Sequence, residues 1–360
     1  MLEKNKQEVS NVSGSIVQQA NGDIHNHGLG YSDVKDICRD VIRQEFGIVT
    51  KEAYDKLNKI IEEFQNRLIE KLAELNDQNV INKFKEPRYQ FVLHDTIKKY
   101  AQSDSEEIKE DLVGVLIDRL QVGENSTEKY IIEDAIQVIP KLSVAMSRLL
   151  GAILMRRMEE RNISFIFRAN LAEQARLYEH LDEVSNLDIA FLHQLNCCET
   201  MHGLTRMVTI EEEMRRRYDL FFRQTTSFEE YQRYISEHPA LAPGLKGMAF
   251  VCGDIKNKCR MVSLSTNQLK SSLQNEGRMD LWPELETYIN TLRPLNDDEI
   301  RNMLIEINPN WGKLINLFHQ DNIQNLKLTP VGVYIANRIV RKEKMRVANT
   351  TLKELFKNER

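Results

Sequence analysis

Apolar residues recur at helical spacing along most of the chain after residue 30. The first stripe lies in YSDVKDICRDVIRQEFG at 31–47, where apolar residues at i, i+3, i+4, i+7 and i+8 predict an amphipathic helix. A longer stripe follows Thr50 and predicts a second helix that ends near 76–79. The apolar positions of the two stripes are Val34, Ile37, Cys38, Val41 and Ile42, then Ala53, Leu57, Ile60, Ile61, Phe64, Leu68, Leu72 and Leu75.

Helix start and stop residues delimit further helices in the first half of the chain. Helices are predicted after Pro87 and after Ser105, and another from about Ser126 must stop near Pro140. Ser143 is expected to cap the helix that follows. The first 160 residues therefore contain a series of helices with short connections.

The second half of the chain is also rich in helical patterns. A second helical region begins around Ser164 and contains LAEQARLYEHLDEV, LDIAFLHQLNCCETMHG and IEEEMRRRYDLFF. Helices are expected near 266–275 and 297–307, and Thr329-Pro330 is a strong start for the last one. Between these helices, MAFV and RMVSL flank a polar turn and predict a small β-hairpin near 248–264.

These patterns place the chain in the all-α class, as a multi-helix body in two helical regions. We expect an N-terminal helical domain at 31–160 and a C-terminal helical domain at 161–360. Residues 1–30 form a separate N-terminal part of different character. This part is interpreted either as a polar β-type oligomerisation segment or as a disordered tail.

The N-terminal segment SIVQQANGDIHNHG, residues 15–28, has neither a helical pattern nor the composition of an ordinary linker. Turn-forming Gly and Asn residues separate two short β-prone pieces, 15–19 and 23–25. Strands this short cannot bury enough apolar area to be stable alone. Copies of the segment from neighbouring chains would complete them, either in a stack or in a closed oligomer.

Homotypic assembly through residues 9–28 would align apolar columns and amide ladders between the copies. The residues expected to carry this assembly are Val12, Ile16, Val17, Gln18, Gln19, Asn21, Ile24 and Asn26. The alternatives are a disordered tail and a contact with nucleic acid or another ligand. Under the assembly hypothesis the main partner of the chain is another copy of itself, and a further protein partner remains open.

Several stretches of the sequence resemble a known but uncharacterised family of bacterial proteins with locus-tag names. The stretches that carry this resemblance are HGLGYSDVKDICRDV, KEAYDKLNKIIEEF, EDAIQVIPKLS and LKLTPVGVYIA. The resemblance covers most of the chain and is weakest between 240 and 260. It implies no established activity, so it assigns no catalytic residue.

The opening segment is also similar to the RHIM-like amyloid signalling motifs of bacterial defence proteins. The core of those motifs is an apolar residue, Gln, an apolar residue and Gly. The corresponding residues here are Val17-Gln18-Gln19-Ala20, which depart from the pattern at the last two positions. This resemblance implies signalling or effector work in bacterial stress or phage defence.

The formal net charge of −5 disfavours a dedicated binder of duplex DNA, because basic faces supply most of the affinity for the phosphate backbone. No stretch approaches the roughly 18 apolar residues of a membrane span, and MLEKNKQEVS lacks the apolar core of a secretory signal. Five cysteines without a spaced framework fit a reducing compartment. We therefore expect a cytoplasmic protein that does not bind membranes.

The segment LHQLNCCETMH is the strongest candidate for a metal site. On a helix, His193 and Cys197 lie at i,i+4, and so do Cys198 and His202 on a neighbouring face. Adjacent side chains on a helix point about 100° apart, so the four cannot close one tetrahedral site without unwinding. We favour buried thiols beside histidines over structural zinc, and predict neither a bound metal nor a cofactor.

Charged residues elsewhere are expected to be mostly solvent-facing. IEEEMRRR contains three i,i+4 pairs, which favour a solvated helical face. The pairs are Glu211–Arg215, Glu212–Arg216 and Glu213–Arg217. Asp111 and Asp118 are likewise interpreted as solvent-facing or capping positions.

Basic residues of the last helix are the candidate surface for nucleic acid or a protein partner. They are Arg338, Arg341, Lys342 and Arg346, and they spread around most of the helix. The sequence contains no Gly-rich phosphate loop, no HExxH and no GxSxG. The favoured function is therefore a non-enzymatic, self-associating signalling or effector protein. A nucleic-acid-associated regulator and an enzyme of unrecognised type are the alternatives.

Overall fold

The computed structural model describes residues 29–45, 51–157, 164–201, 208–241, 249–251 and 258–343. The proposed assembly segment at 9–28 lies outside these residues, as do His202 and Arg346. The contacts divide the chain into two compact units, Met1–Gln102 and Ser103–Arg360. The domain boundary expected near residue 160 falls inside the second unit. The contacts place the division between Gln102 and Ser103 instead.

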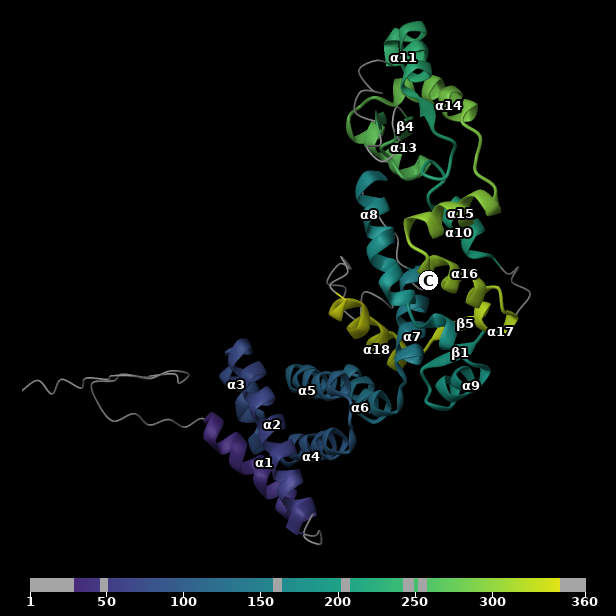
Figure 1. Ribbon diagram of the computed structural model, residues 1–360. Coiled ribbons are helices and arrows are strands. Elements are labelled where there is room, and N and C mark those ends of the chain that lie inside the picture. The colour runs from purple at the N-terminus through teal and green to yellow at the C-terminus, as the bar shows by residue number, and fades with distance from the viewer. Residues whose placement is uncertain are drawn as a thin grey trace, which may run out of the picture. The chain divides into compact units, whose positions relative to one another are not determined.

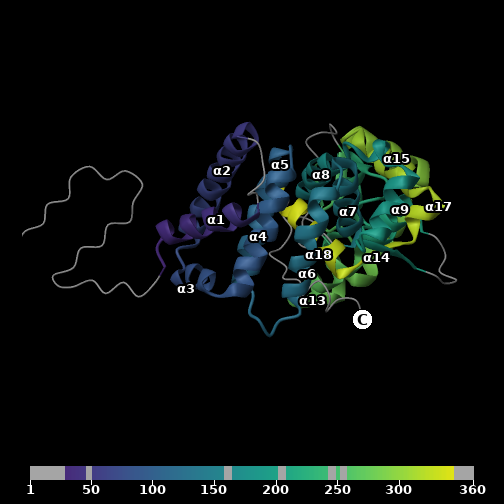
Figure 2. The ribbon, with the colours of Figure 1, turned by 90° about the horizontal axis from the view of Figure 1, so that it is seen from below.

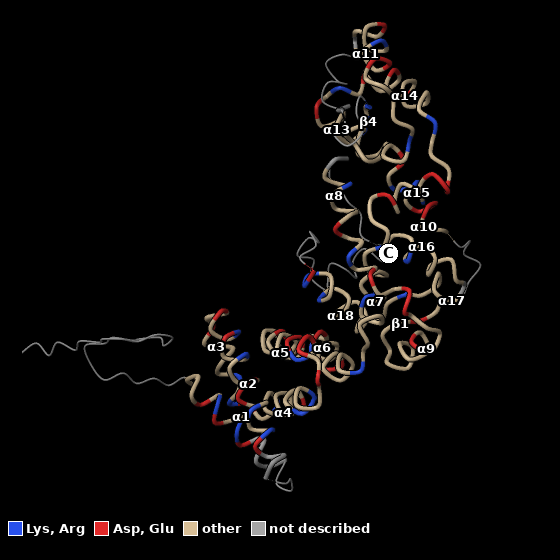
Figure 3. The backbone as a smooth tube through the Cα atoms, in the orientation of Figure 1, with Lys and Arg blue, Asp and Glu red and all other residues tan. Residues whose placement is uncertain are grey.

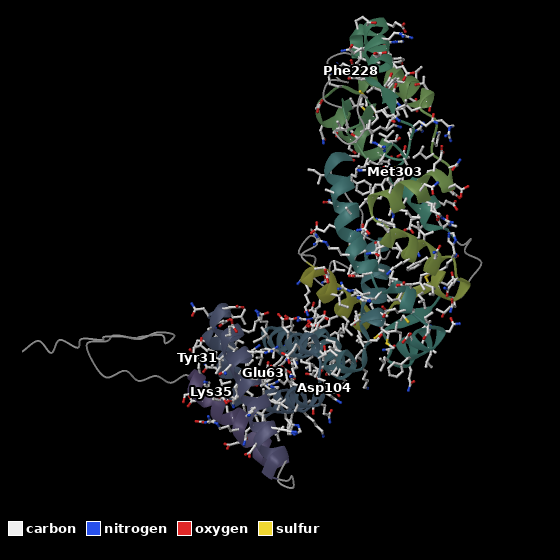
Figure 4. All side chains as sticks on the ribbon, viewed as in Figure 1. Tyr31, Lys35, Glu63, Asp104, Phe228 and Met303 are labelled. Carbon is white, nitrogen blue, oxygen red and sulfur yellow. The ribbon has the colours of Figure 1, made fainter. Side chains whose placement is uncertain are left out.

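The first unit is built from helices (Figure 1). They are α1 (Tyr31–Glu45), α2 (Lys51–Leu75), α3 (Gln78–Asn82), the 3-10 helix η1 (Lys83–Lys85) and α4 (Pro87–Gln102). The predicted stripe of α2 faces the core, where Phe64 and Leu68 are fully buried. The Phe64 ring meets the Tyr100 ring of α4 edge to face, with centroids 5.1 Å apart. Figure 4 labels Tyr31 and Lys35 on α1 of this unit.

The second unit contains most of the remaining predicted helices. Its first part comprises α5 (Glu106–Gln121), α6 (Glu128–Val138), η2 (Ile139–Lys141), α7 (Val144–Arg157), α8 (Ser164–Gln174), η3 (Ala175–Tyr178), η4 (Leu181–Glu183), α9 (Asn186–Gln194), strand β1 (Cys198–Thr200) and α10 (Ile210–Arg217). Its last part comprises α15 (Asp297–Ile307), α16 (Asn310–Phe318), α17 (Asp321–Gln324), strand β5 (Leu326–Leu328) and α18 (Pro330–Lys342). The all-α class is confirmed.

A lobe with its own apolar core separates α10 from α15 along the chain. It contains β2 (Thr226–Ser227), α11 (Phe228–Glu237), η5 (Pro239–Leu241), β3 (Ala249–Val251), β4 (Lys258–Met261), α13 (Thr266–Asn275), η6 (Met279–Leu281) and α14 (Trp282–Thr291). Leu269, Leu273, Leu285 and Tyr288 are among its buried core residues. Figure 4 labels Phe228 at the start of α11.

Two small antiparallel sheets accompany the helices of the second unit. In the lobe, the strand order is β2-β4-β3, and Phe250 pairs with Arg260. The β-hairpin predicted near 248–264 is therefore confirmed. The other sheet joins β1 to β5, with Cys198 opposite Leu328. This pairing links two segments that lie far apart in the sequence.

Helix α18 is the central packing element of the second unit. It packs along α7 and α6, and Figures 1 and 2 both show α18 beside α7. Gly151 on α7 allows this approach, since a Cβ there would meet Leu177 and Ile339 at 3.3 and 3.4 Å. The predicted start of α18 is confirmed, because the Thr329 hydroxyl accepts from the Gly332 N–H and Pro330 occupies the first turn. Helices on both sides of residue 160 therefore share one core.

Candidate functional site

The described part of the chain begins at Leu29, directly after the proposed assembly segment in the sequence. The backbone N–H of Leu29 donates to Asn82 Oδ1 at 3.0 Å, and its carbonyl accepts from Gln78 Nε2 at 2.8 Å. The next residue, Gly30, donates to Asp33 Oδ2 at 2.7 Å. Both backbone polar groups of Leu29 are therefore bonded to side chains of α3, directly before α1 begins.

The helix that carries the candidate metal ligands ends earlier than predicted. Helix α9 stops at Gln194, Asn196 has a left-handed φ of 54°, and β1 begins at Cys198. The prediction that His193, Cys197 and Cys198 lie on one helix was therefore wrong. Asparagine tolerates the left-handed conformation that ends many helices. Asn196 was therefore the signal in the sequence from which the end of this helix could have been predicted.

The two thiols at this helix end are buried, as the sequence favoured. Cys197 and Cys198 are 0% and 3% exposed. Burial raises the pKa of Cys197 to about 12 and that of Cys198 to about 11. His193 Nε2 lies 3.3 Å from the hydroxyl of Thr200. Over the described part of the chain, no group of three or more His, Cys, Asp or Glu residues has the arrangement of a metal site.

Two of the candidate nucleic-acid-binding residues lie against α5. Arg338 Nη1 is 2.5 Å from Asp118 Oδ2, which also accepts from the Tyr334 hydroxyl at 2.6 Å. Lys342, one turn further along α18, lies 3.6 Å from Asp111 Oδ2. Burial raises the pKa of Asp111, while Lys342 and Arg338 act in the opposite direction. Figure 3 shows the acidic positions of α5 in red.

These contacts correct the view of Asp111 and Asp118 as solvent-facing carboxylates. They also show that Arg338 and Lys342 share one face of α18, although the basic residues as a set do not. Gly114 makes room for this arrangement, because a Cβ there would overlap the Arg338 guanidinium. Arg341 is exposed on α18. The charges of Arg338 and Lys342 are thus balanced within the chain.

The solvated face predicted for IEEEMRRR was wrong for Glu211, which is 2% exposed. Its Oε1 accepts from Arg301 Nε on α15 at 2.9 Å, and its Oε2 lies 3.4 Å from His319 Nε2. Arg215, expected to pair with Glu211, lies 2.6 Å from Asp297 instead. Because α10 packs against α15 and α16, Glu211 contacts Arg301 and His319 instead of Arg215.

Glu213 is also buried, and it lies between two guanidinium groups. Its Oε2 accepts from Arg156 Nε and Nη2 on α7 at 2.9 and 2.6 Å. Its Oε1 lies 2.6 Å from Arg217 Nη2, which confirms one of the three predicted i,i+4 pairs. Arg217 also donates through Nη1 to the carbonyl of Arg156. This Arg156–Glu213–Arg217 triad has a formal charge of +1.

The triad lines a small cavity between α7, α8, α10 and α16. The volume of this cavity is about 30 Å³, room for about two waters. Its walls are mainly apolar and aromatic, and include Phe167, Leu171, Tyr178 and Trp311. Burial raises the pKa of Tyr178 far above its ordinary value, so this hydroxyl stays protonated. A cavity with apolar walls and a few convergent polar groups is the usual form of a small-ligand site.

The sequence indicated only part of this site. Glu213 and Arg217 belong to a recognised local pair, whereas Arg156 lies 57 residues from Glu213 along the chain. Trp311 reaches the cavity from α16, where its Nε1 donates to the Leu171 carbonyl at 3.0 Å. Nothing in the spacing of these residues identified the site before the helices were placed.

The fold and the site define the class of the protein as a helical protein with a small cavity lined in part by ion-paired side chains. A model of an uncharacterised family, described only by a locus-tag type name ending in "-like", matches residues 28–354. The chain belongs to this family, which agrees with the family resemblance found from the sequence. No curated protein and no solved structure matches the chain. None of the helices in the described ranges has the length and apolar character required to cross a membrane.

Proposed function

We propose that the protein is a non-enzymatic, self-associating interaction protein of the cytoplasm, assembled through residues 9–28. Its helical units serve as the body that this assembly brings together, in a signalling or effector role in bacterial stress or phage defence. The defence role is supported by the sequence resemblance of the N-terminal segment alone.

The observation that carries the proposal is the pattern of the N-terminal segment, which joins a folded unit at a fixed point. Its β-prone pieces are too short to be stable alone. Leu29, which directly follows the segment, is bonded to Asn82 and Gln78. Association of two copies of the segment would therefore bring their first units close together, because Leu29 is held against α3.

The basic surface of α18 supports the nucleic-acid alternative less well than its sequence suggested. Arg338 and Lys342 already face Asp118 and Asp111. A nucleic acid would have to displace these intramolecular partners before it gained the charge of either residue. We therefore keep self-association as the proposed function.

Point substitutions in the full chain test the proposal. Replacing Ile16 and Ile24 together by Asn removes two apolar columns and keeps the length and net charge. We expect the parent to sediment as an oligomer and this variant as a smaller species. Ser15→Asn is the control, because it changes a polar position of the same segment. A parent that sediments as a monomer at all tested concentrations would overturn the proposal.

A further inference from the structure

We propose that the cavity beside Arg156, Glu213 and Arg217 binds a small monoanionic carboxylate. The binding residues are the two arginines, and the carboxylate of the ligand would lie beside that of Glu213. The proposal is independent of self-association, because it concerns side chains of α7, α8, α10 and α16 alone.

The charge of the triad provides the first argument. Two guanidiniums share one carboxylate, so one positive charge has no counter-charge within the triad. The three side chains are only 20%, 12% and 22% exposed for Arg156, Glu213 and Arg217. A net positive charge on these three partly buried side chains favours the binding of an anion beside them. A single negative charge is sufficient.

The geometry of the donors provides the second argument. Glu213 accepts from Nε and Nη2 of Arg156 and lies against Nη2 of Arg217. The second terminal nitrogen of Arg217, Nη1, donates to the Arg156 carbonyl. Each guanidinium has five N–H donors, so further N–H groups remain for a ligand. Planar guanidiniums fit the two oxygens of a carboxylate better than they fit a spherical anion. One face of Arg156 is held over the Phe318 ring at 4.6 Å, which fixes its orientation.

The size and walls of the cavity restrict the ligand further. A cavity volume of about 30 Å³ admits a group of a few heavy atoms and not a large organic molecule. Phe167, Leu171 and Trp311 line the same cavity as the arginines and offer apolar surface there. Formate and acetate match both kinds of lining, since they combine a carboxylate with a small apolar part.

Tryptophan fluorescence of the full chain can detect this binding directly. The chain has two tryptophans, and Trp282→Phe leaves Trp311 of the cavity as the sole reporter. Acetate is titrated at constant ionic strength, balanced by a sulfonate too large for the cavity. We expect a saturable change in Trp311 emission with acetate, and weaker binding of chloride and of phosphate. Equal responses to the three anions would overturn the assignment to carboxylates.

Three variants on α10 separate binding from a purely structural role. Arg217→Gln removes donors and a charge and should weaken acetate binding by about tenfold or more. Glu213→Gln removes the competing carboxylate and should tighten it. Arg216→Gln is the matched control, because Arg216 is exposed on the same helix, and it should leave the affinity unchanged.

A purely structural triad would be destabilised by Arg217→Gln and by Glu213→Gln, and the parent would not bind acetate. Saturable acetate binding by the parent that Arg217→Gln weakens and Arg216→Gln leaves unchanged is thus the result that a structural role does not produce. Far-ultraviolet circular dichroism checks folding, and Arg217→Lys replaces Arg217→Gln if the latter does not fold. Failure of acetate to change the emission of the parent would overturn the proposal, whatever Glu213→Gln does.

Discussion

Gly332 stands where the first turn of α18 passes the carbonyl oxygen of Cys197. A Cβ at residue 332 would overlap this backbone oxygen, so even alanine requires the helix to shift. We expect Gly332→Ala to lower the free energy of unfolding by about 1–3 kcal/mol, as measured by urea denaturation. Gly123→Ala is the control, because a Cβ there meets no atom within 4 Å. Equal losses in the two variants would contradict this account of the contact.

The buried cysteines give a prediction for high pH. Burial raises the pKa of Cys38 and Cys197 to about 12, above the ordinary value of 9.0. The folded state therefore keeps protons that the unfolded chain releases above pH 9, and the folded state binds more protons between these values. The stability contributed by these thiols is complete below pH 9. It should fall as the pH rises from 9 towards 12, which thermal unfolding across this range can measure.

The same burial should protect these thiols from alkylation. At pH 8, we expect iodoacetamide to label Cys38 and Cys197 in urea but only slowly in the native protein, because the thiolate is the nucleophile. Mass spectrometry of peptides separates the individual cysteines. Native labelling of Cys197 at the rate found in urea would show that its thiol is accessible.

The charged residues show what the sequence can and cannot indicate at this scale. The Glu213–Arg217 pair followed from helical spacing and is present. The burial of Glu211 did not follow, because Arg301 lies 90 residues away and only the packing of α15 brings it close. Local spacing predicts pairs within a helix, whereas the burial of a face depends on which other helix covers it.

At the scale of helices and strands, local chemistry was a better guide. Thr329 and Ser143 cap their helices as expected, and the hairpin of β3 and β4 is present. The end of α9 was missed because apolar residues continue past Gln194, although Asn196 in the left-handed conformation stops the helix. The β1–β5 pairing could not be predicted, since neither three-residue strand has a pattern of its own.

The contact between α18 and α5 gives a prediction at this scale. Arg338 is bonded to Asp118 and is 23% exposed, whereas Lys342 on the same face is more open and reaches Asp111 at 3.6 Å. We expect Arg338→Gln to lower the free energy of unfolding by about 1.5–3 kcal/mol, because Asp118 loses a charged partner. Lys342→Gln should cost at most about 1 kcal/mol. Urea denaturation of both variants checks the ranking, and a larger loss for Lys342→Gln would contradict it.

For the whole molecule, the sequence predicted the all-α class but not the division into units. The helices before residue 160 looked continuous with those of the first unit. In the structure, α6 and α7 instead pack on α18, which begins only at Pro330, far along the chain from both. Contacts between distant segments leave no local pattern, so only the placed helices reveal this division. The cavity could not be predicted for the same reason, because its lining comes from α7, α8, α10 and α16 together.

The central claim about the whole molecule is that residues 9–28 bring copies of the chain together. The most direct measurement is the mass in solution of the full chain and of residues 29–360, by sedimentation equilibrium over a range of concentrations. The shorter chain retains every residue of the two units that the structure describes. Our account predicts an oligomer for the full chain and a smaller species for residues 29–360. Equal masses for the two proteins would contradict it.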